Sequence, residues 1–594
     1  MDRADRDGPP PVNIERPDTT AAAGRGAVTH PAKLAIAALF AFVVLAQGIS
    51  APFQKDAEPQ SAEWIASIVR DGHWLIPIDA YGYSDRKPPL FYWLSALAAK
   101  ATGGSVDEVR ARAVSLVAGI ALATAVLAWT AANVGASGGW LAFIFMLGTY
   151  GFVSRATEAL TDMLMTFLLF AAYCWLAPLV DNSEPLARAE PRRPIEAGLI
   201  LGLAVLAKGP VAIVLCALAA SIYVLIERRN PIAILGQRWP WQVVAIAVGL
   251  GAVWYVPAAI IGGNKILRIS VAENFGHFMP VKLGGTGESS RPFYFIAARL
   301  TGGAFPMTLL IAPAALALYT GEISAGKRRA VIWQVSMSLA VLIFFSIASV
   351  KRDDYILPAI PGIAILCASV FTLEVRGAAS KVRDGLVALF ELSPIWLFLF
   401  VALFSSHVPH VNLESSDAAY YSVFKTMGKS FVGAEVAWLA AIGVVIFAII
   451  RRRAIVIGVA FGLFALCLSL FWTAGLRPGL ATMRSVKNFV PIVEDHVKGD
   501  QLCIPGGINY ELSYYYGAAV PDLANPRCAN AAAGKPVYLI ATPRELDAMT
   551  PEYRERLKLI AKSNLIGGGG APALYEIPPS GANGGLKGAG GAAK

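Results

Sequence analysis

The sequence predicts an α-helical polytopic membrane protein with a small α/β domain near its C-terminal end. The first observation is composition: 56% of the 594 residues are hydrophobic and 15% are charged, whereas soluble globular domains average about 25% charged residues. The second is that the apolar residues fall in runs of about twenty, the length that crosses a bilayer. The third is that most of the net charge of +10 lies in short loops between these runs. This placement argues against a nucleic-acid-binding function.

The two ends of the chain have the composition of disordered segments. Residues 1–32 are rich in Pro, Gly, Ala and charge without periodicity, which predicts a disordered cytoplasmic tail. Residues 581–594 are a Gly/Ala-rich segment of low complexity, and a second disordered tail is expected there. The first apolar run follows a long polar segment and precedes about twelve further runs, so it is interpreted as a retained anchor and not as a signal peptide.

Between these tails, residues 33–474 are predicted to form a transmembrane domain of about thirteen helices. The expected spans are 33–51, 111–131, 137–153, 157–179, 195–207, 209–226, 241–262, 302–319, 331–350, 355–374, 385–405, 433–450 and 454–473. The fifth and sixth spans are the shortest pair, and they meet at Lys208-Gly209-Pro210.

The charges of the loops predict the orientation. With the N-terminus in the cytoplasm, the chain returns to that side at five loops, and each of them is basic, as the positive-inside rule requires. Their basic residues are Arg188, Arg192 and Arg193; Arg228, Arg229 and Arg238; Lys327, Arg328 and Arg329; Arg376, Lys381 and Arg383; and Arg451, Arg452 and Arg453. We therefore expect a bacterial inner-membrane protein whose C-terminal domain lies in the periplasm.

The C-terminal domain is predicted to cover residues 475–580, where the long apolar runs end. Short apolar segments at 501–504, 537–541 and 573–577 are expected to be strands, and stretches at 484–497 and 553–562 to be helices. Two of the six cysteines, Cys503 and Cys528, fall in this domain. A disulfide between them suits an oxidising periplasm, but the sequence leaves the pairing open.

The long outer loops carry the residues with the most specific chemistry. Asp56 and Glu58 follow the first span directly, and Asp85-Arg86-Lys87-Pro88-Pro89 follows about thirty residues later. The stretches near 59–70 and 90–99 are expected to form surface helices. Charge held near hydrocarbon is costly, so ionisable residues at a membrane face are functional candidates.

These motifs, taken in order, resemble those of one protein family. They are Asp56-Ala57-Glu58, Lys87-Pro88-Pro89-Leu90, Arg155 to Asp162, Leu206 to Pro210, and Tyr355-Ile356-Leu357-Pro358. The set resembles the membrane-embedded C-superfamily glycosyltransferases that use polyprenyl-phosphate sugars, in the branch of the bacterial aminoarabinose transferases and protein O-mannosyltransferases. Arg86 stands where this branch often has a glutamate. The resemblance implies a polyprenyl-phosphate sugar donor and a lipid or glycan acceptor.

Sugar transfer from such a donor leaves negative charge on the departing phosphate, so nearby fixed cations lower the barrier. The expected phosphate-binding residues are Lys87, Lys208, Lys351 and Arg352. The expected catalytic residues are Asp56, as the base that takes a proton from a hydroxyl acceptor, with Glu58 and Asp162 as orienting groups. Asp85, Arg155, Tyr355 and His277 are expected to line the substrate site.

Each assignment has a structural alternative. Asp56 and Glu58 would also suit the N-terminus of a helix that begins near Pro59, and Lys87 would suit an anchor at the lipid headgroups. The remaining alternatives are an Asp162–Arg155 bridge, a turn lysine at Lys208, and a solvated cluster of Lys351, Arg352, Asp353 and Asp354.

Two other functional classes stay open, a flippase or transporter and a polysaccharide polymerase acting on lipid-linked sugars. The sequence requires no cofactor, and nothing in it supports a divalent metal ion. It also lacks C-x-x-C, H-E-x-x-H and Walker patterns. The sugar and the acceptor, whether lipid A, another envelope lipid, a glycan or a protein hydroxyl, are not identified by the sequence.

Overall fold

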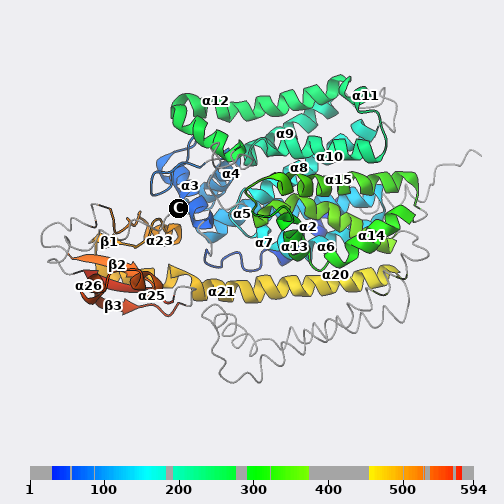
Figure 1. The fold of residues 1–594 in the computed structure, drawn as a ribbon. Helices are drawn as coiled ribbons and strands as arrows, with labels where there is room; N and C mark the ends of the chain where they lie inside the picture. The colour runs from blue at the N-terminus through cyan, green and yellow to red at the C-terminus, as the bar shows by residue number, and fades with distance from the viewer. Residues whose placement is uncertain are drawn as a thin grey trace, which may run out of the picture.

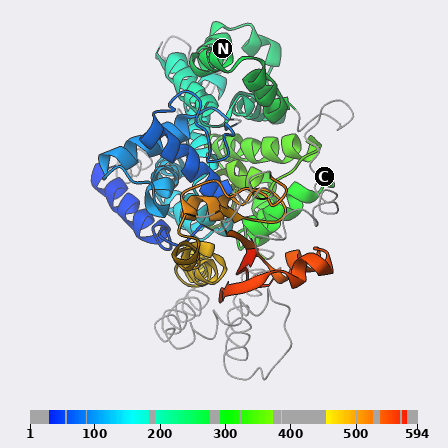
Figure 2. The ribbon, with the colours of Figure 1, turned by 90° about the vertical axis from the view of Figure 1, so that its left-hand side faces the viewer.

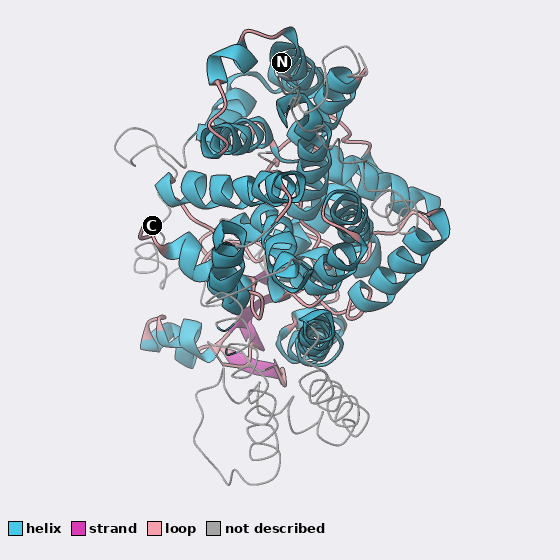
Figure 3. Ribbon diagram, turned by 90° about the vertical axis from the view of Figure 1, so that its right-hand side faces the viewer, coloured by secondary structure: helices cyan, strands magenta, loops and turns pink. Residues whose placement is uncertain are grey.

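The structure is a computed structural model, and helices dominate it. It describes residues 30–53, 57–85, 87–181, 192–275, 291–320, 323–372, 381, 385, 454–499, 501–525, 528, 536–565 and 570–577. The long helices run in a common direction, and a small sheet lies beyond one end of the bundle, here called the sheet end (Figure 1). Seen from the opposite end, helices fill the view and strands occupy one small region (Figure 3).

Several helices are long and apolar enough to cross a membrane, so the chain is a multi-pass membrane protein. By length and composition the described residues contain six such helices, or up to eight if each of two bent pairs is one span. The six are α5 (Glu108–Asn133), α8 (Asp162–Asp181), α12 (Arg238–Phe275), α15 (Ala325–Ile347), η4 with α16 (Asp353–Ala359, Ile360–Thr372), and α20 with η5 and α21 (Ala454–Leu470, Phe471–Leu476, Arg477–Arg484).

The two bent pairs fall where single spans were expected. They are α6 with α7 (Ala136–Leu147, Tyr150–Ala156), bent by 68°, and α13 with α14 (Phe295–Gly303, Thr308–Thr320), bent by 101°. The predicted count of thirteen is not confirmed. Two of the predicted spans lie outside the described residues, 433–450 entirely and 385–405 from residue 386 on, as do 1–29 and 581–594 of the predicted tails.

Among the described residues, three shorter helices are also apolar, α2 (Pro31–Leu45), α4 (Leu90–Ala101) and α10 (Val211–Ile226). Helix α9 (Arg193–Lys208) directly precedes α10. The sequence signal at Lys208-Gly209-Pro210 ends α9, because Gly209 adopts a φ of 101° that residues with a side chain rarely adopt. Small residues let α9 approach α12 closely. A Cβ on Gly198 would lie 2.9 Å from Ile246, and one on Gly202 would lie 2.8 Å from Leu250.

Both expected surface helices are present, as α3 (Ala57–Asp71) and α4 (Leu90–Ala101). Trp64, Ile65 and Ile68 of α3 are buried, as their helical spacing predicts. The Trp64 ring meets the Tyr92 ring of α4 edge-on, with centroids 5.5 Å apart. The two helices, which both belong to the loop after the first span, therefore pack against each other.

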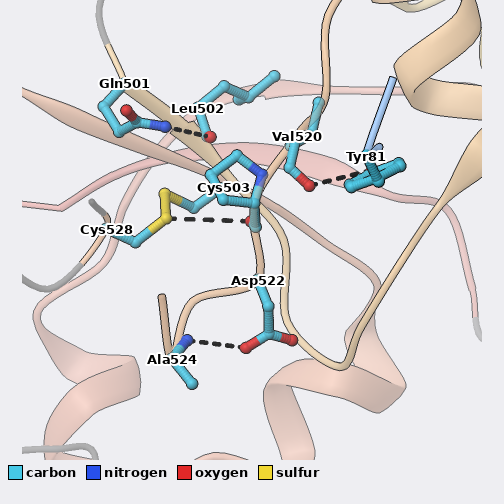
Figure 4. Close-up of a disulfide and its surroundings, with 9 residues drawn as sticks. Tyr81, Gln501, Leu502, Cys503, Val520, Asp522, Ala524 and Cys528 are labelled. Atoms are coloured by element: carbon cyan, nitrogen blue, oxygen red, sulfur yellow. Dashed lines mark hydrogen bonds between the residues drawn. A yellow bond between two sulfur atoms is a disulfide. The ribbon is translucent and has the colours of Figure 1, made fainter. Parts of the chain in front are cut away.

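The C-terminal unit contains a four-stranded sheet in the order β1-β2-β4-β3, with β1 (Gln501–Cys503), β2 (Val537–Ala541), β3 (Lys558–Lys562) and β4 (Ala573–Ile577). The β1–β2 pair is parallel, whereas the β2–β4 and β3–β4 pairs are antiparallel. The helices of the unit are α22 (Val490–Val497), α23 (Tyr510–Tyr516), α25 (Pro543–Asp547) and α26 (Pro551–Glu555). A disulfide joins Cys503 to Cys528, which answers the pairing that the sequence left open (Figure 4).

Two helix predictions in this unit were wrong in part. The expected helix over 553–562 ends early, and Lys558–Lys562 pairs with β4 as an edge strand instead. Lys558 contacts Glu576 across the strands at 3.3 Å, so pairing with a neighbouring strand overrides local helix propensity. The expected helix over 484–497 is interrupted at Ser485, whose backbone is extended, and Pro491 opens α22 in its first turn.

The C-terminal unit contacts the first outer loop through α23. This helix packs against α3, although the two are more than 400 residues apart in sequence. In the view along the bundle from the sheet end, α23 and the strands lie across the ends of the helices (Figure 2).

Candidate active site

A polar cavity of about 460 Å³ lies where α7, α8 and the loops before α4, α13 and η4 meet. Five predicted site residues line it: Lys87, Arg155, Asp162, Lys351 and Arg352. The other lining residues are Ala57, Leu160, Arg291, Val350, Asp353 and Asp354. The described lining thus has five cations and three carboxylates. This formal excess of two positive charges favours an anionic ligand.

Lys87 is the lysine best placed to bind such an anion. Its side chain is half-buried in the cavity wall, and within the part of the chain that the structure describes its ammonium makes no hydrogen bond or ion pair. Burial disfavours the charge, but the carboxylates of Asp85, Glu273 and Asp162 offset this effect and raise the pKa of Lys87. The ammonium therefore stays charged while its hydrogen-bonding capacity is unused. The predicted lining residue Asp85 is itself buried, close to Lys87 and the Tyr92 hydroxyl.

Lys208 and Asp162 form a buried ion pair at the base of the cavity. Asp162 is in the first turn of α8 and Lys208 in the last turn of α9, so the ends of two packed helices bring the charges together. The ammonium of Lys208 also lies 5.5 Å from the centroid of the Tyr355 ring. That ring stacks on Phe345 with centroids 4.3 Å apart. Lys208 and Tyr355 therefore support Asp162 from behind the cavity wall.

Arg155 reaches the cavity from α7 and is paired with Glu158 at 2.5 Å, not with Asp162. Asp354 lies within electrostatic reach of both Arg155 and Lys208. The Asp162–Arg155 bridge, the structural alternative for Asp162, is not formed; Asp162 pairs with Lys208 and Arg155 with Glu158.

The charged residues between α15 and η4 have two different roles. The Lys351 ammonium donates to the carbonyl oxygens of Arg291, at 2.9 Å, and of Ala348, at 2.5 Å. It therefore fixes the loop that carries Arg291 and has little capacity left for a ligand. Arg352 is exposed at the cavity, and its neighbour Asp353 pairs with Arg299 at 3.0 Å.

Two predicted residues, Asp56 and His277, lie outside the described residues. Ala57, which follows Asp56 in the chain, lines the cavity. The catalytic role of Asp56 stays a prediction.

Glu58 faces away from solvent and is bonded on both oxygens. Its Oε1 accepts from Arg112 Nε at 2.8 Å and from the Ala159 amide at 2.9 Å, and its Oε2 accepts from Arg112 Nη2 at 3.1 Å. Arg112 also donates to the carbonyls of Ile49 and Ala51. Burial opposes ionisation of Glu58, but the Arg112 guanidinium outweighs it and lowers the pKa of the carboxyl. This geometry suits fixing the loop better than touching a substrate.

We expect Glu58→Gln to lower the free energy of unfolding by about 3 kcal/mol, because it leaves Arg112 buried without its counter-ion. Since the folded-state pKa of Glu58 lies below its ordinary 4.5, this contribution is complete above pH 4.5 and is lost as the pH falls through the folded value. Thermal unfolding of both proteins in nanodiscs between pH 4 and 8 measures the difference.

The matched control is Asp71→Asn, which breaks the exposed Arg70–Asp71 pair in the same helix and should leave stability nearly unchanged. Unchanged stability in Glu58→Gln, together with lost turnover, would show that Glu58 orients the substrate instead.

The sequence did not reveal that Arg291, Asp353 and Asp354 line the cavity. It also did not reveal that Arg112 binds Glu58 and that Arg477 binds Thr157. The charged cluster at 351–354 was a usable signal for the two aspartates. Arg477 is buried and donates to Thr157 in the turn before α8, a contact across 320 residues that no local pattern reveals.

The described residues contain no group of three or more His, Cys, Asp or Glu side chains arranged to hold a metal ion. The polar groups at the cavity are instead a mixture of cations and single carboxylates.

In a comparison with protein families, residues 77–266 match the model described as dolichyl-phosphate-mannose-protein mannosyltransferase. This range includes Lys87, Arg155, Asp162 and Lys208. It thus covers the ion pairs on α7, α8 and α9 described above.

Curated relatives include the undecaprenyl phosphate-alpha-4-amino-4-deoxy-L-arabinose arabinosyl transferases of Enterobacter sp. (strain 638) and Shewanella sediminis. The first is 28% identical over 59% of this chain and 63% of its own length, and the second 24% identical over 56% and 58%. An uncharacterized protein of Aquifex aeolicus is 25% identical over 57% of this chain and 62% of its own. The chain thus spans about six tenths of the length of these relatives.

Among solved structures, ArnT from Cupriavidus metallidurans bound to undecaprenyl phosphate matches with a TM-score of 0.69 and 16% identity, over 92% of this chain and 97% of that one. The apo form of the same protein gives a TM-score of 0.66. The chain therefore has the fold of ArnT, and the predicted resemblance to the membrane-embedded C-superfamily glycosyltransferases is confirmed.

Proposed function

We propose that this chain is a glycosyltransferase that moves a sugar from a polyprenyl-phosphate donor to an acceptor at the cavity. The observation that carries the proposal is the ammonium of Lys87, which makes no hydrogen bond or ion pair with a described residue, in a cavity wall whose described lining has excess positive charge. A phosphate that gains charge as the C1–O bond breaks is stabilised by a fixed cation of this kind.

The donor phosphate is held by Lys87 together with Arg352 and Arg291. Arg352 and Arg291 line the same cavity, and the Arg291 guanidinium lies 4.5 Å from the Phe295 ring centroid, a contact that leaves its donors available. As the glycosidic bond breaks, these cations meet the charge that develops on the leaving phosphate. The polyprenyl chain stays in the bilayer.

Asp56 is the general base. It takes the proton of an acceptor hydroxyl as that oxygen attacks the anomeric carbon, a role that requires a carboxylate within hydrogen-bond reach. The Asp162–Lys208 and Glu158–Arg155 pairs fix the part of the cavity wall that carries Asp162 and Arg155 and balance the charge there. With an acceptor phosphate, which is already ionised, Asp56 would only orient it.

The acceptor we propose is lipid A or another envelope lipid or glycan. The arabinosyl transferases among the curated relatives are named for undecaprenyl phosphate carrying 4-amino-4-deoxy-L-arabinose. That compound is therefore the first donor to test with this chain.

Mass spectrometry of envelope lipids tests this function in cells. Deleting the gene should remove one sugar-modified lipid or glycan species, and the native chain, but not the Asp56→Asn variant, should restore it. An unchanged envelope profile in the deletion strain would contradict the proposal, and a species lost but restored equally by both chains would contradict the role of Asp56.

The proposed site requires the sheet end to face the periplasm, with residues 33–474 in the inner membrane and 475–580 outside it. A cysteine introduced at Glu552, which is exposed on α26, should then react with a membrane-impermeant maleimide on intact spheroplasts. A cysteine at the exposed Arg228, in the basic loop between α10 and α11, should react only after lysis. The reverse pattern would contradict the orientation.

A further inference from the structure

A second cavity, here called the apolar cavity, lies where α8, α9, α10, α11 (Pro231–Leu235) and α12 meet. Its volume is about 310 Å³, which falls within the usual range of small-molecule pockets. Helix α11 lies at the end of the bundle opposite the sheet end (Figure 1). The apolar cavity is therefore distinct from the polar cavity that contains Lys87.

The lining of the apolar cavity offers no free polar group to a ligand. The Ser221 hydroxyl donates to a carbonyl of its own helix at 2.8 Å. The indole N–H groups of Trp239 and Trp241 donate to oxygens in the turn after α11 and in α11 itself, at 2.8 and 2.9 Å. Apart from these groups and the Cys216 thiol, the side chains of the lining are hydrocarbon. This chemistry suits a hydrocarbon chain.

The apolar cavity opens toward the bilayer. Leu225, Leu235 and Trp241 line it, and each keeps more than half of its surface exposed. Trp241 belongs to α12, which is long and apolar enough to cross a membrane. Tryptophan is enriched at the depth of the lipid headgroups, so Trp239 and Trp241 place the mouth of the cavity at that depth. A lipid can therefore insert an acyl chain and keep its headgroup at the rim.

Two arginines flank α11 at this rim, and both side chains are exposed. The Arg228 amide donates to the carbonyl of the lining residue Leu225 at 3.2 Å. Arg238 directly precedes the lining residue Trp239 in the first turn of α12. Within the described part of the chain, neither guanidinium makes a hydrogen bond or an ion pair. Both are thus available to a lipid phosphate.

The carboxylates near this rim are already paired with other arginines. Asp181, which follows the lining residue Val180, binds Arg229 and lies 3.6 Å from Arg329. Glu227 lies 3.8 Å from Arg328. The charges of Arg228 and Arg238 are therefore not balanced by these two acids, and a basic pocket between membrane helices favours an anionic headgroup.

The sugar donor is a poor match to this rim. Asp162 at the polar cavity and Asp181 beside the rim are the first and last residues of α8, so they lie about 28 Å apart at a rise of about 1.5 Å per residue. A donor whose phosphate occupies the polar cavity cannot also bring that phosphate to Arg228 and Arg238. A separate lipid is needed to use them.

We propose that the apolar cavity binds one acyl chain of an anionic glycerophospholipid, whose phosphate is held at the rim by Arg228 and Arg238. The proposal goes beyond sugar transfer and does not depend on it. The bound lipid fills the space between α10 and α12 and attaches α11 to both. Its binding should therefore also raise the temperature at which the chain unfolds.

Native mass spectrometry tests the headgroup preference. The full chain in detergent is equilibrated with equal amounts of dioleoyl-phosphatidylglycerol and dioleoyl-phosphatidylcholine, and the native chain should retain the first in preference to the second. Arg228→Gln and Arg238→Gln should each weaken retention of phosphatidylglycerol about fivefold, the usual contribution of one basic residue near a lipid surface. Both side chains are exposed, so folding should be unaffected.

Lys33→Gln is the matched control, because Lys33 is an exposed cation in the first turn of α2, which packs on α5 and α6 and does not line the apolar cavity. It should keep native retention. Equal retention of the two lipids by the native chain, or the same loss in Lys33→Gln as in the arginine variants, would overturn the proposal.

Filling the cavity tests where the acyl chain lies. Ala217 lines the apolar cavity and is exposed, so Ala217→Phe should occupy the space and abolish retention of phosphatidylglycerol. Val248→Phe, on the exposed face of α12 outside the lining, should leave it unchanged. Thermal unfolding without added lipid checks that both variants fold. Native retention in folded Ala217→Phe, or equal loss in both variants, would overturn the proposal.

Competition with undecaprenyl phosphate separates the two lipid sources. An excess of undecaprenyl phosphate should leave phosphatidylglycerol bound to the native chain, because the two lipids occupy different cavities. Displacement of phosphatidylglycerol would show that the apolar cavity receives the isoprenoid chain of the donor, and it would overturn the proposal while leaving the proposed glycosyltransferase function untouched.

Discussion

Replacing Asp56 by Asn is expected to lower turnover by about a hundredfold or more, because the variant has no base to accept the proton of the acceptor hydroxyl. The change is isosteric, and it leaves intact the hydrogen bonds of the nearby residues Phe53 and Glu58. Thermal stability and binding of undecaprenyl phosphate should therefore match those of the native chain. Initial rates of sugar transfer at saturating donor measure the effect.

The control for Asp56→Asn is Asp71→Asn, at the far end of α3, which removes a carboxylate of the same loop away from the cavity. It should keep native turnover. Equal activity of the Asp56→Asn variant and the native chain would remove Asp56 from the mechanism. The carboxylate of Asp354 would then be the next candidate, because it lines the same cavity.

Replacing Lys87 by Met is expected to weaken binding of undecaprenyl phosphate by about tenfold to a hundredfold, the usual contribution of a hydrogen bond to a charged group. Turnover should fall about a hundredfold, because the charge on the leaving phosphate is no longer met. Methionine keeps the length of the side chain, but the buried Asp85 carboxylate loses a nearby cation, so thermal stability is measured beside affinity and turnover. Undecaprenyl phosphate is a suitable ligand for the binding measurement because it is the part that all donors of this class share.

Lys100→Met is the matched control, since Lys100 is exposed in the last turn of α4 and its ammonium lies 5.3 Å from the Trp74 ring centroid. An anchoring lysine of this kind should affect stability slightly and affinity not at all. If Lys87→Met also leaves affinity and turnover unchanged, the phosphate is bound by other cations, with Arg291 and Arg352 the first to test.

Much of the fold follows from patterns that are local in the sequence. The run lengths predict the long helices, the spacing of Trp64, Ile65 and Ile68 predicts α3, and Gly209 marks the end of α9. The bends between α6 and α7 and between α13 and α14 were not predicted, because packing against other helices decides where an apolar run breaks. The strand at Lys558–Lys562 was missed for a similar reason, since it depends on pairing with β4.

The sequence indicated which charged residues lie at the cavity better than it indicated which residues they form ion pairs with. Lys87, Arg155 and Asp162 line one cavity. That Asp162 pairs with Lys208 and Glu58 with Arg112 depends on contacts across 46 and 54 residues. Helix packing determines which residues form such pairs. A sequence motif that contains one residue of a pair therefore does not reveal whether the charge of that residue is available to a ligand.

The mass balance of the reaction with purified protein tests most directly whether the chain breaks the bond between a sugar and a polyprenyl phosphate. The full chain in nanodiscs is supplied with an undecaprenyl-phosphate monosaccharide and an envelope-lipid acceptor, without ATP or an ion gradient. Mass spectrometry then follows undecaprenyl phosphate and glycosylated acceptor. We expect the two products to appear in equal amounts with the native chain and to be nearly absent with Asp56→Asn. Donor that stays intact while it moves between the leaflets of a vesicle containing the chain would contradict the account and indicate a flippase.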